Sequence, residues 1–433
     1  MSKKDNNIDK QVEDIEQQDK KPVVPKTAQI QQIKDFIDKS YDVRFNSVTQ
    51  TLEYREKNTI GYEQLTDQIK TDIIIQLKQL FFKKPKEDLD DLLNSSMIPR
   101  YDPMKEYFNT IPYNGDGFIA RLANCIVLDE PDKIIDGQRF QDLFRSYFEK
   151  WLIACYRCCI GKLVNDVMFI LIGPQGLYKT TFLNYLTPSS MEDYRVCSHL
   201  TTSLSDYNTS NFLAEKMFIN VDDQMETIFG KDYNSMKAII SAPDITNRKL
   251  YRATHQRRKR IANFCGTVNE SRFLRDSNNR RYLCFAVADI KQGYKNIDMD
   301  DVWAEVKRKS DQINSMYIFG RDDYRIIDLM NTSYEAPTVE SEMLHSVFKP
   351  EDESDRSPVF YMQFSEILHF LKVESGDNSL KIFNLQTAMR KFGFRTRSVK
   401  VSRFGKSPRY LYPVQLINQT EDLCSRLFQY RKE

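Results

Sequence analysis

One stretch of the sequence combines a glycine-bearing loop with a lysine and two threonines, a set of residues suited to holding phosphate. It follows the apolar run 168–172 and consists of Gly173-Pro174-Gln175-Gly176-Leu177-Tyr178-Lys179-Thr180-Thr181. A strand that ends in such a loop and opens a helix aims several backbone N–H groups at one point, where the helix dipole also favours an anion. Lys179 would reach the β- and γ-phosphates of a nucleotide, and the Thr180 hydroxyl would bind Mg²⁺. We therefore expect a nucleotide site lined by Gly173, Gly176, Tyr178, Lys179, Thr180 and Thr181.

The loop departs from the usual phosphate-loop pattern at Tyr178, which occupies the place of the second glycine in G-x-x-x-x-G-K-[ST]. If the backbone there has a positive φ, a bulky residue is strained by about 1–3 kcal/mol. If Tyr178 already lies in the first helical turn, the cost is small. A purely structural turn between a strand and a helix is the alternative interpretation of the whole stretch.

Two further strand-like runs lead into polar residues that fit the same chemistry. KMFINV is followed by Asp222 and Asp223, and IANFCG is followed shortly afterwards by Asn269. A carboxylate at a strand tip can hold a metal with its water shell, and the next one can polarise an attacking water. Taken alone, such a pair is more often a turn or a helix cap, and Asn269 could be a turn residue. We predict that Asp222 binds metal and that Asp223 and Asn269 act in catalysis with Lys179.

Arg280 and Arg281 precede a further apolar run, YLCFAV. An arginine at such a place can reach the γ-phosphate bound by a neighbouring subunit, as an arginine finger does. A finger that acts on a neighbour implies a ring of identical chains. The sequence leaves open which of the two arginines has this role.

Two basic segments suggest contact with nucleic acid. The first, ITNRKLYRATHQRRKR (245–260), contains Arg248, Lys249, Tyr251 and Arg252, which could grip and stack on a single strand. The alternatives are a solvated basic loop and a face for subunit contact.

The second basic segment follows two predicted helices, FSEILHFLK and NLQTAMRKFGF, the second capped by Asn384 and stopped by Gly393. RTRSVKVSRFGKSPRYLYPV then predicts a hairpin, which completes a winged-helix pattern. We expect duplex DNA to contact Arg395, Arg397 and Arg403, with protein binding as the alternative.

The order of apolar runs and helical patterns predicts an α/β fold with a P-loop ATPase core, a helical N-terminal region and a C-terminal winged-helix-like domain. The predicted segments are a disordered tail (1–27), a mostly helical N-terminal region (28–160), a P-loop ATPase domain with a lid (161–348), an acidic linker (349–357) and a winged-helix-like domain (358–433).

The composition of the 433 residues sets broad limits. Lys plus Arg (63) and Asp plus Glu (61) nearly cancel, so a nucleic-acid surface must come from local clusters. The eight cysteines lack zinc-ligand spacing and suggest reduced structural thiols of a cytoplasmic protein. We expect no membrane association, because no apolar run is long enough to span a bilayer and the N-terminus does not resemble a signal peptide.

The motifs in sequence order resemble those of the virulence-associated protein E group, which is related to superfamily 3 helicases of viruses, phages and mobile elements. The resemblance rests on GPQGLYKTTFL, NVDDQ, RKLYRATHQRRKRIANFCGTVN and SNNRRYLCF. It implies an AAA-like, superfamily 3 type core that uses ATP and Mg²⁺. Lys179 and Thr180 would be the Walker A pair, Asp222 and Asp223 the Walker B pair, and Asn269 sensor 1. The basic interval would be a hairpin that points into the ring channel.

The resulting hypothesis is a DNA-dependent ATPase, a ring-forming replicative helicase of a mobile genetic element or phage. It would hold single-stranded DNA in its channel and duplex DNA at its C-terminal domain. The alternative is a nucleotide-gated DNA-binding initiator or defence-type switch that does not unwind DNA. A small-molecule P-loop kinase explains neither the basic interval nor the tail.

Overall fold

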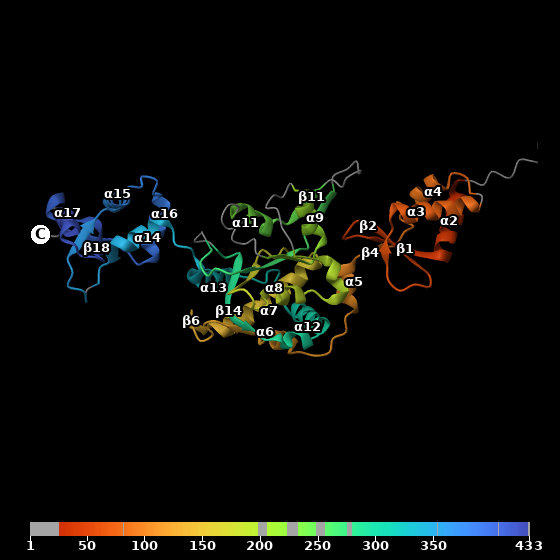
Figure 1. The fold of residues 1–433 in the computed structure, drawn as a ribbon, viewed down its shortest axis with the longest axis horizontal. Coiled ribbons are helices and arrows are strands. Elements are labelled where there is room, and N and C mark those ends of the chain that lie inside the picture. Colours follow the sequence, from red (N-terminus) through yellow and green to blue (C-terminus); the bar gives the residue numbers. More distant parts are fainter. Residues whose placement is uncertain are drawn as a thin grey trace, which may run out of the picture.

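The computed structural model describes residues 26–80, 82–197, 206–222, 233–247, 256–274, 279–352, 354–405 and 407–431. Most of the segment predicted to be a disordered tail therefore lies outside the described residues. Along the chain, an N-terminal region is followed by a central body and then by a C-terminal region (Figure 1).

The central body is built on a six-stranded sheet with the order β5-β14-β8-β13-β10-β9. Its strands are β5 (Ile126–Leu128), β8 (Met168–Ile172), β9 (Arg195–Cys197), β10 (Phe218–Val221), β13 (Asn263–Val268) and β14 (Tyr282–Ile290). All neighbouring pairs are parallel except β14 and β5. The protein is thus a mixed α/β protein with a parallel-stranded sheet, consistent with the predicted P-loop core.

The apolar run of β8 is unbroken because both faces of the sheet are covered. Phe169 and Leu171 join one hydrophobic core, and Ile170 and Ile172 join another on the opposite face. In Figure 1, α6, α7 and α12 lie on one side of the central body, with α9 and α11 on the other. A parallel sheet buried in this way is expected to have continuous apolar strands instead of alternating ones.

The helices of the central body come from distant parts of the sequence. They are α5 (Pro103–Thr110), α6 (Phe118–Ala123), α7 (Phe140–Cys159), α8 (Lys179–Tyr185), α9 (Tyr207–Glu215), α11 (Tyr233–Ser241), α12 (Met299–Gln312) and α13 (Arg321–Asn331). Trp151 of α7 stacks on Phe169 of β8 with ring centres 4.9 Å apart. The core of the central sheet therefore includes residues on both sides of the predicted boundary at residue 160. Among the described helices, none is long and apolar enough to cross a membrane.

The cysteines are free thiols, as the sequence suggested. Cys155, Cys158 and Cys159 lie on α7 and are buried against the strand that begins at Asn263. Burial raises the pKa of Cys155 and of Cys159 well above the ordinary value for a thiol. These thiols stay protonated and act as small apolar packing groups.

The N-terminal region combines helices with a four-stranded sheet of order β3-β2-β1-β4. Its elements are α2 (Lys26–Ser40), β1 (Tyr41–Asn46), β2 (Thr51–Glu56), β3 (Glu63–Gln64), α3 (Asp67–Gln79), α4 (Pro85–Leu93) and β4 (Arg100–Tyr101). β1 and β2 form an antiparallel hairpin with Tyr41 opposite Glu56. The region predicted to be mostly helical thus also contains a four-stranded sheet.

The C-terminal region has its own hydrophobic core and a sheet in which β18 pairs with β15, β16 and β17. Its elements are α14 (Val339–Val347), β15 (Phe348–Pro350), β16 (Val359–Met362), α15 (Phe364–Ser375), α16 (Ile382–Lys391), β17 (Arg397–Val399), β18 (Arg409–Leu416) and α17 (Glu421–Leu427). The hairpin predicted within residues 395–414 is present as β17 and β18, and Gly393, at φ +81°, follows α16 as predicted.

The predicted cap of α16 is wrong. The helix begins at Ile382, before Asn384, and its N-cap residue is Lys381. The Asn384 amide donates instead to the Glu340 carboxylate on α14, at 3.1 Å. A hydrogen bond to another helix therefore replaces the local capping bond that the sequence favours.

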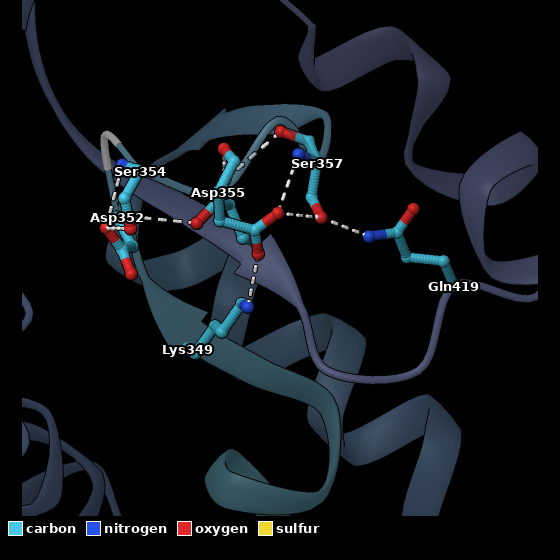
Figure 2. Close-up of polar contacts among 7 residues, drawn as sticks. Lys349, Asp352, Ser354, Asp355, Ser357 and Gln419 are labelled. Carbon is cyan, nitrogen blue, oxygen red and sulfur yellow. Dashed lines mark hydrogen bonds and ion pairs between the residues drawn. The ribbon is translucent and has the colours of Figure 1, made fainter.

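The segment predicted to be an acidic linker forms a folded turn between β15 and β16. Figure 2 shows the Asp355 carboxylate accepting hydrogen bonds from the Lys349 ammonium and, at 2.9 and 2.5 Å, from the backbone N–H and the hydroxyl of Ser357. These partners, Lys349 first, lower the pKa of Asp355 to about 2. The acidic residues satisfy local donors and hold this turn in shape.

Candidate phosphate-binding site

The loop between β8 and α8 has positive φ angles at Gly173, Gly176 and Tyr178. Gly173 has φ +156°, and a Cβ there would lie 2.8 Å from the Val287 carbonyl oxygen of β14, so only glycine fits. Gly176 has φ +89°. Tyr178 is the N-cap of α8 with φ +59° and ψ +23°. The backbone therefore needs the conformation that glycine supplies easily, and Tyr178 adopts it at a cost of about 1–3 kcal/mol.

Lys179 lies inside the curve of this loop and is only 6% exposed. Its ammonium donates to the carbonyl oxygens of Gly173 (2.7 Å) and Pro174 (2.8 Å) and to the side-chain oxygen of Asn269 (3.3 Å). A buried ammonium is favourable only with such partners or with an anion. The lysine is thus fixed at the centre of the loop, where a phosphate could take over its contacts.

Thr180 is linked to the neighbouring carboxylate strand. Its hydroxyl donates to the Asp222 carboxylate at 2.7 Å, and the hydroxyl of Thr267 on β13 donates to the same oxygen at 2.5 Å. Thr181 is exposed on the first turn of α8. The sequence had not pointed to Thr267, although it lies two residues before Asn269 on the strand between β8 and β10.

The sheet order explains how these residues meet. β13 lies between β8 and β10, and all three strands run in the same direction. The ends of parallel strands meet at one edge of a sheet, so residues far apart in sequence converge there. Asn269, at the end of β13, thus lies between the carboxylate strand and the loop. The catalytic roles of these residues stay predictions.

The donor set suits Mg²⁺ bound together with a nucleotide. Mg²⁺ favours hard oxygen ligands and is typically held by one or two protein groups plus phosphates and water. The Thr180 hydroxyl and the Asp222 carboxylate supply such groups side by side. In the described part of the chain, no three His, Cys, Asp or Glu residues gather as an independent metal site.

Arg280 and Arg281 lie at the other edge of the sheet. The carbonyl of Arg281 accepts a hydrogen bond from the N–H of Met168, the first residue of β8, at 2.8 Å. The Arg281 guanidinium donates to the Ser241 hydroxyl at 2.6 Å. Arg280 is exposed, and its guanidinium lies 5.3 Å from the centre of the Tyr324 ring. The structure therefore does not bring either arginine to the loop of its own chain.

The predicted DNA-binding residues of the basic interval, Arg248, Lys249, Tyr251 and Arg252, lie outside the described residues, and so does Asp223. The base of the interval is a hairpin of β11 (Asp244–Asn247) and β12 (Gln256–Lys259).

Arg260, at the end of the same interval, is 1% exposed. Its guanidinium donates to the carbonyls of Ala262 (2.9 Å) and Asn165 (2.6 Å) and to that of Ile240. Part of the positive charge counted in the interval is therefore internal to the fold and does not face a ligand.

The predicted DNA-binding arginines of the C-terminal region differ in exposure. Arg395 is exposed, and the half-exposed Arg397 pairs with Glu351 at 3.0 Å. Arg403 donates two hydrogen bonds to the Glu366 carboxylate, at 2.6 and 3.1 Å, and one to the Tyr361 carbonyl at 2.5 Å. Arg403 is thus held within the C-terminal region by its own chain.

Residues 134–335 match the virulence-associated protein E-like domain. This part of the chain is a virulence-associated protein E-like domain. It includes the loop with Lys179, the strand ends at Asp222 and Asn269, and both arginines. The resemblance inferred from the motifs is confirmed.

Solved structures similar to this chain include the apo structure of the NrS-1 C-terminal region. The identity is 13%, the TM-score is 0.48, and the likeness covers 90% of this chain and 99% of that one. The A form apo structure of the same region has 13% identity, a TM-score of 0.45 and the same coverage. No match was found among curated protein sequences.

Proposed function

We propose that the chain is a DNA-dependent ATPase and works as a ring-forming helicase of the superfamily 3 type, from a mobile genetic element or phage. The observation that carries this proposal is the hydrogen-bonded set at the carboxyl edge of the sheet. Lys179 reaches Asn269, and Thr180 reaches Asp222, within a virulence-associated protein E-like domain. An unused relic of the site would not need these residues of α8 and of the ends of β10 and β13 to be brought together.

In this proposal each residue has a separate task. Lys179 exchanges its carbonyl partners for oxygens of the β- and γ-phosphates, and Thr180 and Asp222 hold Mg²⁺. Asn269 orients the attacking water and Asp223 accepts its proton. The new bond joins the water oxygen to the γ-phosphorus, and the bond between that phosphorus and the β-γ bridging oxygen breaks.

The position of the arginines supports assembly into a ring. Arg280 and Arg281 lie at the amino edge of the sheet, one strand length from the loop. An arginine there cannot reach the γ-phosphate of its own chain, but it can face the loop of the next copy. A finger of this kind contributes about 10³–10⁵ in rate.

The DNA contacts are proposed on separate surfaces. The segment between β11 and β12, with Lys249 and Arg252, would hold single-stranded DNA in the channel. The C-terminal region would be a winged-helix-like domain, supported by its order of helices followed by a hairpin. Its exposed Arg395 and half-exposed Arg397 are the better candidates for duplex phosphates, because Arg403 is engaged with Glu366.

The test measures ATP hydrolysis with and without single-stranded DNA, the mass of the protein with a nonhydrolysable nucleotide, and strand displacement on a forked duplex. We expect DNA to stimulate hydrolysis, the nucleotide to drive assembly, and the fork to open. Absence of hydrolysis under all conditions contradicts the proposal. DNA-stimulated hydrolysis without strand displacement favours the nucleotide-gated switch instead.

The assignment of duplex DNA to the C-terminal region has its own test. Neutralising Arg395 and Arg397 should reduce the dependence of duplex binding on salt by roughly 0.9 log units per log salt for each lost phosphate contact. Basal hydrolysis should be unchanged, because the two arginines are remote from Lys179. An unchanged salt slope would make this region a protein-contact module.

A further inference from the structure

Tyr178 is an exposed aromatic side chain at the mouth of the phosphate loop. Its side chain is 56% exposed although its backbone is strained at φ +59°. Burial of the ring in its own chain therefore does little to offset the strain. A strained residue that its own chain barely packs is often kept for a ligand.

The surroundings of the Tyr178 ring are aromatic and cationic. The Lys295 ammonium lies 6.0 Å from the centre of the Tyr178 ring and 5.9 Å from that of Tyr294. The Lys295 side chain is exposed. This flank of the loop thus offers a ring face and a cation that can donate hydrogen bonds.

This flank is held firmly against the phosphate loop. Lys295 belongs to the short helix η2 (Gln292–Asn296), which follows the carboxyl end of β14. The Tyr185 hydroxyl of α8 donates to the carbonyls of Lys295 (3.1 Å) and Ile297 (2.9 Å). Tyr294 is fully buried and packs edge-on against Phe182 of α8, with ring centres 5.2 Å apart. These contacts connect the aromatic flank to α8, the helix that begins at Lys179.

We propose that Tyr178 and Lys295 form the nucleobase end of the nucleotide site. The base stacks on the Tyr178 ring, and Lys295 donates to an acceptor on the base or ribose. This inference rests on the proposed function, because the phosphates must be held by Lys179. Stacking uses the π-face that every base has, so it favours a nucleoside triphosphate over inorganic tripolyphosphate but distinguishes ATP from GTP only weakly.

The test compares Mg²⁺-dependent binding of ATP, GTP and inorganic tripolyphosphate to the full chain by calorimetry. In Tyr178→Leu, binding of ATP and GTP should weaken by about 5- to 150-fold, the range for loss of one base–aromatic stack. Tripolyphosphate binding should be unchanged, and Tyr178→Phe should resemble the wild type. Lys295→Met should cause a smaller loss, again confined to the nucleotides. Tyr410→Leu removes an even more exposed ring from the C-terminal region and should have no effect.

Equal weakening of ATP and tripolyphosphate in Tyr178→Leu would overturn the inference, because the tyrosine would then act only on loop shape. Unchanged nucleotide binding together with loss of assembly would also overturn it and would assign the ring to a subunit contact. If the wild type binds ATP no more tightly than tripolyphosphate, the inference about Tyr178 and Lys295 is contradicted, but the proposed function is not. A wild-type chain that binds neither ligand contradicts the proposed function itself.

Discussion

The two edges of the central sheet carry polar residues that are used in different ways. At the carboxyl edge, Lys179, Thr180, Asp222 and Asn269 are linked to one another or to the loop. At the amino edge, Arg260 is bonded to backbone carbonyls, whereas Arg280 is exposed beside Tyr324.

The difference separates the groups that bind phosphate and Mg²⁺, which lie together at the carboxyl edge, from the exposed arginine at the amino edge. The carboxyl edge has the lysine, the hydroxyl and the carboxylate that phosphate and Mg²⁺ require. In the proposed ring, the positive charge that stabilises the γ-phosphate would come from the amino edge of a neighbouring copy, where Arg280 is exposed.

The largest expected effect comes from the exposed arginine. Arg280→Ala should lower ATP hydrolysis by about 10³–10⁵-fold and leave nucleotide binding nearly unchanged. The structure favours Arg280 over Arg281 because the Arg281 guanidinium is bonded to Ser241. Steady-state hydrolysis and equilibrium nucleotide binding measure the two effects separately.

Two controls accompany this prediction. Mixing Arg280→Ala with Lys179→Ala subunits should restore part of the activity, because a mixed interface has one intact loop and one intact finger. If Arg281→Ala alone abolishes hydrolysis and Ser241→Ala does not, the finger is Arg281 and our choice is wrong. Failure of co-assembled mixtures to recover activity would contradict action on a neighbour.

The next effect is expected at the carboxyl edge. Lys179→Ala should weaken nucleotide binding on the order of 10²–10³-fold, since a preorganised charge on the phosphates is lost. Asp223→Asn should bind nucleotide normally but not turn it over. Lys162→Ala, which removes an exposed lysine from the segment between α7 and β8, is the matched control and should bind nucleotide normally. Equal hydrolysis by the wild type and Asp223→Asn would exclude Asp223 from the mechanism.

A smaller effect, on stability, should separate the arginines of the basic interval. Arg260→Leu leaves several buried carbonyls without a donor and should lower the free energy of unfolding by about 3 kcal/mol. Arg257→Leu removes a side chain that is 76% exposed and paired with Asp244, and should change it by less than about 0.5 kcal/mol. Chemical denaturation of both variants provides the comparison. Similar losses of unfolding free energy in the two variants would mean that Arg260 does not stabilise the fold more than Arg257 does.

Local patterns predicted much of the carboxyl edge. The apolar runs gave the strands, and the rule that parallel strands end together explains why Asp222 and Asn269 meet the loop. The φ of Tyr178 stayed open, because the sequence fits both a left-handed residue and a first helical turn. Side-chain partners were the hardest to foresee. Arg260 and Arg403 are bonded by groups that only the folded chain brings near, so their charge alone suggested DNA.

The smallest expected effect concerns Tyr178, the residue that departs from the phosphate-loop pattern. Tyr178→Gly removes the steric strain of a left-handed tyrosine, worth about 1–3 kcal/mol, but adds conformational freedom to the unfolded chain. The net result should be a gain of about 1 kcal/mol in the free energy of unfolding, measured by chemical denaturation. Tripolyphosphate should still bind, because Lys179 and the loop amides remain. Destabilisation by this substitution would show that the Tyr178 ring contributes more to packing than its exposure indicates. The tyrosine would then stabilise the conformation of the loop.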